Sequence, residues 1–130
     1  MRNLQELVND CISQLSGPHA EDAWHSLVES GPAALSHLVV AFNATSVPHV
    51  RSQLVRVVSE WRSSEAMPFL AGLLREPGTE LWKEALDGLV KTGGPASLQA
   101  LDSVQRVSPP DRRAWLREAI EQIIDATRPG

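Results

Sequence analysis

Apolar residues recur every three or four positions along most of the chain, which is the spacing of one buried face of an α-helix. Alternation with a period of two, which is typical of strands, never persists beyond a few residues. Glycine and proline interrupt the helical pattern, for example at Gly31-Pro32 and Gly94-Pro95, where helices commonly stop and start. The pattern predicts an all-α protein of about eight short helices.

The helical segments are of two types, which alternate with a period of 30–34 residues. Residues 82–90 and 116–124 match in residue class at nearly every position at an offset of 34, and residues 50–58 fit the same frame at an offset of 32. The second type aligns residues 31–38 with residues 94–101 at an offset of 63. Because a pair of helices cannot bury both apolar faces alone, such pairs stack and share a continuous core.

The repeats predict a single domain over residues 1–130. Its expected parts are a cap helix over residues 2–15, helical pairs over about 18–43, 48–75 and 78–107, and a closing helix over about 110–126. The second helices carry small residues that permit a neighbouring helix to approach closely, at Ala34, Ala66 and Ser97. The larger residue after each of these is expected to fill the seam between helices.

Three segments carry a family likeness: Val50-Arg51 at the start of a helix, residues 64–70, and residues 82–89. Together they resemble the HEAT-repeat family, and most nearly its short bacterial, lyase-type HEAT-like repeats. In that family a basic residue stands near the start of the first helix of each pair. Arg51, Lys83 and Arg117 occupy this position. The resemblance implies a right-handed α-α superhelix, that is, a HEAT-like solenoid.

The resemblance covers about residues 18–125 and implies a curved array with the second helix of each pair on the concave face. The outward residues of these helices are therefore the candidate partner-binding set, and their mixed polar and apolar character suits a protein ligand. They are Ser36, His37, Val40, Asn43, Phe69, Gly72, Arg75, Glu76, Gln99, Asp102 and Arg106. Trp61 and Trp115 are candidate anchors, because tryptophan is favoured in interface hot spots.

The formal net charge of −4 is unevenly distributed along the chain. Residues 1–50 hold five acids and one base, whereas residues 51–130 hold eleven of each. An acidic half disfavours nucleic acid and favours a basic protein partner through electrostatic steering. The one basic cluster, with Trp115 interleaved, supports the alternative of a nucleic-acid-binding or catalytic array. Its members are Arg106, Arg112, Arg113 and Arg117.

Composition indicates a cytoplasmic protein without a membrane segment. The mean hydropathy is −0.16, and no apolar run approaches the ~20 residues that span a bilayer. The first residues lack the apolar core of a signal peptide. The single cysteine, Cys11, excludes an intramolecular disulfide and fits a reducing compartment. Its place on the apolar stripe of the first helix predicts a packed thiol.

No constellation for catalysis, metal or cofactor binding stands out. The four histidines lack the spacing of metal ligands, and no phosphate-binding loop or nucleophile motif is present. Glu84 and Asp87 share a helix face, but Lys91 lies four residues after Asp87, which favours an ion pair on a solvated surface. We therefore expect no enzyme activity, no cofactor and no metal.

The interpretation that best fits these features is a non-enzymatic protein–protein interaction module. Small bacterial adaptors and immunity proteins that neutralise a toxin are analogous in size and charge. The expected partner is another protein, of basic character, and nucleic acid is disfavoured. The chain is expected to be a monomer or a weak homodimer that associates through its exposed cap helices.

Overall fold

The computed structural model describes residues 3–75 and 81–127, and all regular secondary structure in these residues is helical. Short 3-10 turns at Pro32–Ala34 and Ser64–Ala66 lead into two of the helices. The eight α-helices of the described residues are α1 (Leu4–Gln14), α2 (Ala20–Ser30), α3 (Leu35–Ala44), α4 (Pro48–Glu60), α5 (Met67–Arg75), α6 (Leu81–Thr92), α7 (Gly94–Gln105) and α8 (Pro110–Thr127). The prediction of an all-α, solenoid-like fold is confirmed.

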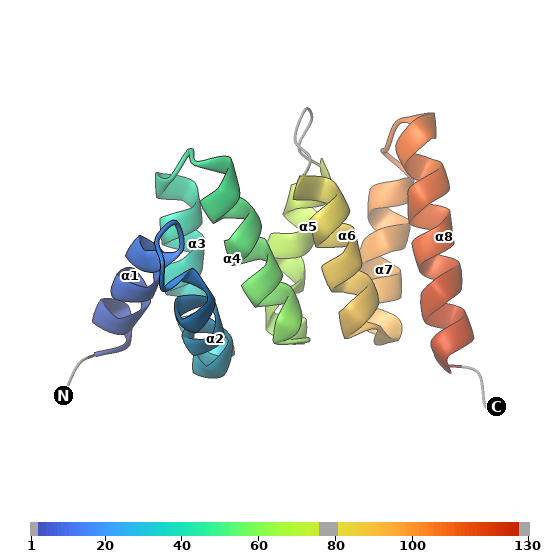
Figure 1. Cartoon of the computed structure of the whole chain (residues 1–130). Helices are drawn as coiled ribbons and strands as arrows, with labels where there is room; N and C mark the ends of the chain where they lie inside the picture. Colours follow the sequence, from blue (N-terminus) through green and yellow to red (C-terminus); the bar gives the residue numbers. More distant parts are fainter. Residues whose placement is uncertain (1–2, 76–80, 128–130) are drawn as a thin grey trace.

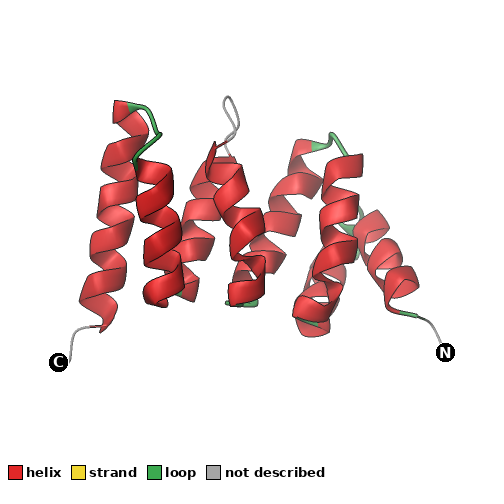
Figure 2. Ribbon diagram, turned by 180° about the vertical axis from the view of Figure 1, so that it is seen from behind, coloured by secondary structure: helices red, strands yellow, loops and turns green. Residues whose placement is uncertain are grey.

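The helices stand side by side in a row that has α1 at one end and α8 at the other (Figure 1). Two layers are visible: α2, α4, α6 and α8 form a first-helix layer, and α3, α5 and α7 form a second-helix layer behind it (Figures 1 and 2). Within the first-helix layer each helix packs on the next, and α3–α4, α5–α6 and α7–α8 contacts join the layers. Helix α1 packs on both α2 and α3 and closes its end of the row.

Two glycines turn the chain from a first helix into the following second helix. Gly31 and Gly93 have backbone φ angles of +72° and +65°. Residues that carry a Cβ atom rarely adopt such positive φ angles. Proline follows within two residues of each glycine, in the first turn of the new helical segment, where its missing N–H is not needed. The sequence breaks at these positions are therefore real helix boundaries.

The core runs along the seam between the two layers. Fully buried leucines from seven helices, α2 to α8, contribute to it: Leu27, Leu38, Leu54, Leu70, Leu89, Leu101 and Leu116. The small residues expected at the seam are buried as predicted, with Ala34 and Ser97 0% and Ala66 1% exposed. The larger residues after them also contribute to the seam: Met67 is buried in the core, and the half-buried Leu35 and Leu98 pack against it.

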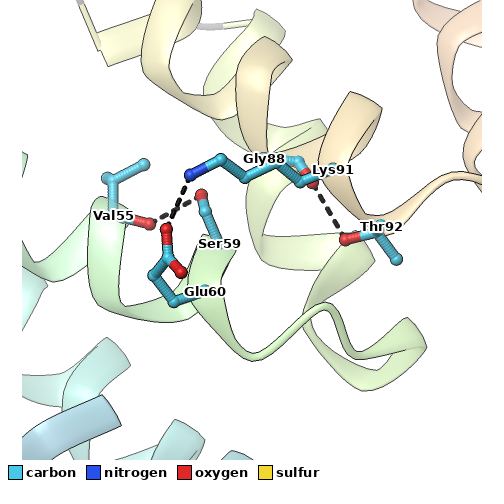
Figure 3. Close-up of polar contacts among 6 residues, drawn as sticks. All are labelled: Val55, Ser59, Glu60, Gly88, Lys91 and Thr92. Atoms are coloured by element: carbon cyan, nitrogen blue, oxygen red, sulfur yellow. Dashed lines mark hydrogen bonds and ion pairs between the residues drawn. The ribbon is translucent and has the colours of Figure 1, made fainter.

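Helices α4 and α6 approach closely at Ser59 and Gly88. A Cβ atom built on Gly88 would collide with the Ser59 hydroxyl and would come within 3.2 Å of Leu70 Cδ1. The Ser59 hydroxyl is itself fixed, because it donates to the Val55 carbonyl one turn earlier at 2.8 Å (Figure 3). Only a residue without a side chain fits at this crossing.

Candidate interaction surfaces

The described members of the set expected to bind a partner lie on the second-helix layer, which faces the viewer in Figure 2. Most of them are exposed, although His37 and Phe69 are half-buried. Val40 is 70% exposed. Glu76 lies outside the described residues. Their role in binding stays a prediction.

His37 and Val40 line a hollow of about 450 Å³ between α1 and α3. Its other lining residues include Gln5, Asn9 and Ala41. None of its lining residues is an acid, a lysine or an arginine. This hollow therefore has no charge with which to select a charged partner.

Other members of the predicted set already contact residues of the chain. The ring of Phe69 meets that of Phe42 edge-on, with centroids 5.1 Å apart, and so joins α5 to α3. Arg106 Nη2 lies 3.0 Å from a carboxylate oxygen of Asp102, one turn earlier. The charges of this layer are thus partly neutralised within the layer itself.

The basic position near the start of the first helices contacts aromatic rings. The guanidinium carbon of Arg51 lies 4.0 Å from the centre of the Phe42 ring. Lys83 Nζ lies 5.7 Å from the Trp82 ring centre and 5.4 Å from that of Trp115. These cation–π contacts connect neighbouring helices along the row.

Three adjoining hollows on the first-helix layer were not foreseen from the sequence. The central one, of about 460 Å³, shares Trp24 and Arg56 with a second hollow of about 450 Å³. It shares Asp87 and Val90 with a third, of about 90 Å³, between α6 and α8. We call the three together the first-helix groove. Its lining residues are Ala20, Glu21, Trp24, His25, His49, Gln53, Arg56, Ser59, Glu60, Glu84, Leu86, Asp87, Val90, Lys91, Trp115, Glu118, Ala119 and Gln122.

The first-helix groove is acidic. Five carboxylates line it, from Glu21, Glu60, Glu84, Asp87 and Glu118, against the two cations of Arg56 and Lys91. Because field lines concentrate in hollows with low-dielectric walls, such an excess attracts cations more strongly than the same charges on a flat surface.

One cation of the groove already has a partner. Lys91 Nζ on α6 donates to Glu60 Oε1 on α4 at 2.6 Å (Figure 3). The hydrogen bond from Lys91, together with its charge, holds the pKa of Glu60 below its ordinary value. This pair replaces the Asp87–Lys91 pair that the helical spacing favoured. The other cation that lines the central hollow is Arg56.

Only one of the two carboxylate oxygens of Glu84 has a hydrogen-bond partner among the described residues. Its Oε1 accepts a hydrogen bond of 2.6 Å from the Ser52 hydroxyl of α4, the equivalent position in the preceding repeat. Its Oε2 is buried, and no hydrogen-bond partner reaches it from the described residues. The indole Nε1 of Trp24, in the same hollow, is also buried with no acceptor in this part of the chain. The central hollow thus contains one positioned acceptor and one donor without partners.

The two candidate anchor tryptophans differ in environment. Trp61, at the end of α4, is half-buried, and its Nε1 donates to the Val28 carbonyl of α2 at 3.0 Å. Trp115 is 51% exposed and meets Trp82 edge-on with centroids 6.0 Å apart. Trp61 therefore joins two helices of the array, whereas the Trp115 ring is accessible to a partner.

The arginine cluster near α8 is largely engaged within the chain. Arg106 pairs with Asp102, and Arg113 Nε donates to the Ser108 carbonyl at 2.7 Å. Arg112 donates to the Leu74 carbonyl at 3.3 Å, and its guanidinium lies 4.9 Å from the centre of the Trp82 ring. The contacts of Arg112 join α8 to α5 and α6, whereas those of Arg106 and Arg113 are local.

In residues 3–75 and 81–127 no three His, Cys, Asp or Glu side chains gather as a metal site requires. Cys11 is 7% exposed and packs in the core as expected. No helix in the same part of the chain has the length and apolar character needed to cross a bilayer.

A family model described as HEAT repeats matches residues 35–121. No curated protein and no solved structure gives a significant match to the chain. The matched region extends from the start of α3 into α8, and it coincides with the stacked helices and with contacts between equivalent repeat positions such as Ser52 and Glu84. The chain belongs to the HEAT-repeat family.

Proposed function

We propose that this HEAT-repeat protein is a non-enzymatic binding array whose partner is a basic protein. HEAT repeats generally mediate protein–protein interaction, and the family is typically a non-enzymatic scaffold. The observation that carries the proposal is the charge of the N-terminal half. All five acids of residues 1–50 are exposed: Glu6, Asp10, Glu21, Asp22 and Glu29. An exposed acidic end steers a basic protein toward the array and repels nucleic acid.

The biological role that fits this surface is neutralisation or recruitment of the partner. An immunity-type protein covers the basic surface of a toxin, and an adaptor holds a basic protein beside another component. Both roles need a rigid acidic surface and no chemistry. We place the protein in the bacterial cytoplasm, as a monomer or a weak homodimer formed through the end helices α1 and α8.

The alternative of a nucleic-acid-binding or catalytic array rests on the arginines between Arg106 and Arg117. The exposed ring of Trp115 near this cluster favours it. Against it, three of the four arginines already contact carbonyls or a carboxylate of the chain. Glu118 also lies beside Trp115 in the same hollow. The geometry therefore supports a protein partner better.

The proposal is tested by capture from nuclease-treated lysate of the native host, followed by mass spectrometry. The chain is immobilised beside the variant Asp22→Lys/Glu29→Lys, which reverses two exposed acids of α2 that lie outside the first-helix groove. The matched control is Asp111→Lys/Glu121→Lys on α8, which changes the net charge equally. Each variant replaces one acid near the start of its helix and one further along.

We expect basic proteins to bind the wild type and the α8 control at low salt and to elute by ~0.3 M salt. The α2 variant should lose most of them. Retention of neutral or acidic proteins, or equal retention by both variants, would contradict the proposal. Recovery of nucleic acid from untreated lysate would favour the alternative.

A further inference from the structure

We propose that a basic segment of the partner binds in the first-helix groove, where the carboxylates of Glu84 and Asp87 receive one of its cationic side chains. The inference rests on the proposed function, since it names the site at which a basic partner binds. It differs from the sequence-based expectation, which assigned binding to the second-helix layer. The reasons are the charge, the unpartnered polar atoms and the accessible rings of the groove.

The hollows on the two layers differ in charge. The groove has five carboxylates against two cations, and Lys91 is already paired with Glu60. The hollow on the second-helix layer, beside His37 and Val40, has no charged lining residue. A lysine or arginine of the partner therefore gains more Coulomb energy in the groove than on the opposite layer.

Within the groove, the central hollow is the expected seat of the cationic side chain. Glu84 and Asp87 both line it, and they lie three residues apart on α6. The α8 end is less suitable, because Lys83 and Arg112 surround the Trp82 ring there. The charge distribution thus directs the cation toward α4 and α6.

The polar atoms of the central hollow are complementary to the hydrogen-bonding groups of a peptide. Ser52 fixes the Glu84 carboxylate through Oε1, while Oε2 has no partner among the described residues. A buried carboxylate oxygen is costly unless it accepts hydrogen bonds, and a guanidinium or ammonium group supplies charge-assisted ones. Trp24 Nε1 needs an acceptor, which a backbone carbonyl of the same segment provides. Because both atoms are buried in the free chain, the proposed binding includes a shift of each side chain toward the ligand.

Aromatic and apolar surface continues from the central hollow. Trp24 and Val90 line it, and the half-exposed ring of Trp115 lies in the adjoining hollow. Long cationic side chains pack their methylene groups on such surface while the charged end reaches a carboxylate. The ligand we infer is therefore a protein segment with lysine or arginine and at least one neighbouring apolar residue.

The test uses a fluorescein-labelled arginine–serine peptide with a central leucine, and the same peptide with neutral citrulline in place of arginine. Binding is measured by fluorescence anisotropy at low salt. The groove variant is Glu84→Gln/Asp87→Asn, in which glutamine retains an acceptor for Ser52. The matched control, Asp102→Asn/Glu121→Gln, removes two carboxylates outside the groove and changes the net charge equally. Thermal melts of both variants confirm that they fold.

We expect the arginine peptide to bind the wild type and the control within a factor of about two of each other. The groove variant should bind it roughly tenfold or more weakly, because each charge-assisted hydrogen bond contributes about a factor of ten. The citrulline peptide should not bind. Equal weakening by both double variants would overturn the inference, because only net charge would then matter.

The site is located by the indole N–H signals in ¹H–¹⁵N spectra, assigned with single Trp→Phe variants. The signals of Trp24 and Trp115 should shift on titration with the arginine peptide. That of Trp61 should stay in place, since its N–H is bound to the Val28 carbonyl outside the groove.

Three further outcomes would overturn the inference. Shifts confined to His37 and its neighbours would leave a basic partner in place but move its site to the second-helix layer. Absence of peptide binding by folded protein would refute the groove site, while capture of basic proteins by the exposed acids of α2 would still support the proposed function. Tighter binding of a DNA duplex than of the peptide would refute both.

Discussion

Ser59 on α4 and Gly88 on α6 set how closely these two helices pack. Gly88 has no side chain, and the space that its Cβ would need is occupied by the Ser59 hydroxyl. Both residues are buried at the crossing of α4 and α6, and Ser59 also lines the central hollow of the first-helix groove. The same contact that stabilises the array therefore fixes the separation of Glu60 and Glu84 across the groove.

Replacing Gly88 with alanine should destabilise the protein by about 1–3 kcal/mol, because the added methyl group forces the two helices apart. Gly72→Ala on α5 is the matched control, since Gly72 is exposed and no atom lies within 4 Å of its Cβ position. Alanine there should stabilise by about 0.5–1 kcal/mol through helix propensity. Urea unfolding of both variants measures the difference. Equal effects would show that the helix crossing is not tight.

Leu101→Ala on α7 should lower the free energy of unfolding by about 2–5 kcal/mol, because Leu101 is 0% exposed in the seam. Leu98→Ala, one turn earlier, should cost less than about 2 kcal/mol, because Leu98 is only half-buried. Chemical denaturation of the two single variants measures both values. A larger loss for Leu98 would mean that the seam is displaced toward it.

Substitutions of Trp61 and of Trp115 should affect different properties, the first the stability of the protein and the second its binding of a partner. Trp61→Phe removes the hydrogen bond to the Val28 carbonyl and should cost about 1–2 kcal/mol of stability, with little effect on partner binding. Trp115→Ala should change stability by less than about 1 kcal/mol but weaken binding of a basic peptide roughly tenfold, since its ring is half-exposed. Thermal melts and anisotropy titrations on each variant provide the two readouts. The reverse pattern would identify Trp61 as the anchor.

The Glu60–Lys91 pair should add a small, acid-sensitive contribution to stability. Because the folded-state pKa of Glu60 is lowered from its ordinary 4.5, the contribution is present above that value and is lost as the pH falls through the folded-state pKa. Both side chains are partly exposed, so solvent screening limits it to less than about 1 kcal/mol. Wild type should exceed Glu60→Gln in stability near neutral pH and converge with it in acid. A difference that is constant with pH would contradict this account.

The fold was predictable from the sequence because its determinants are local. Apolar spacing of three and four residues defines each helix, and Gly31-Pro32 and Gly94-Pro95 mark helix boundaries that the structure confirms. The repeat frame also identified Ala34, Ala66 and Ser97, which are buried where helices meet. The depth at which Leu35 and Leu98 pack against the core was not predictable, because it depends on the packing of neighbouring helices.

The first-helix groove was not predictable in the same way. Its lining comes from several helices, and each residue alone has the spacing of a solvated helix surface. Lys91 illustrates this, since helical spacing favoured Asp87 as its partner, whereas the structure pairs it with Glu60, 31 residues away. The signal that was present is the repeat frame, which aligns Ser52 with Glu84 at an offset of 32 and so places them together once the repeats stack.

The central claim, that an acidic array binds a basic protein, is tested most directly by the salt dependence of the complex. The dissociation constant of the chain with its isolated partner is measured from ~0.05 M to ~0.5 M ionic strength. We predict that it rises by roughly tenfold or more over this range, because screening weakens attraction between opposite charges. A dissociation constant that does not change with salt would contradict the account.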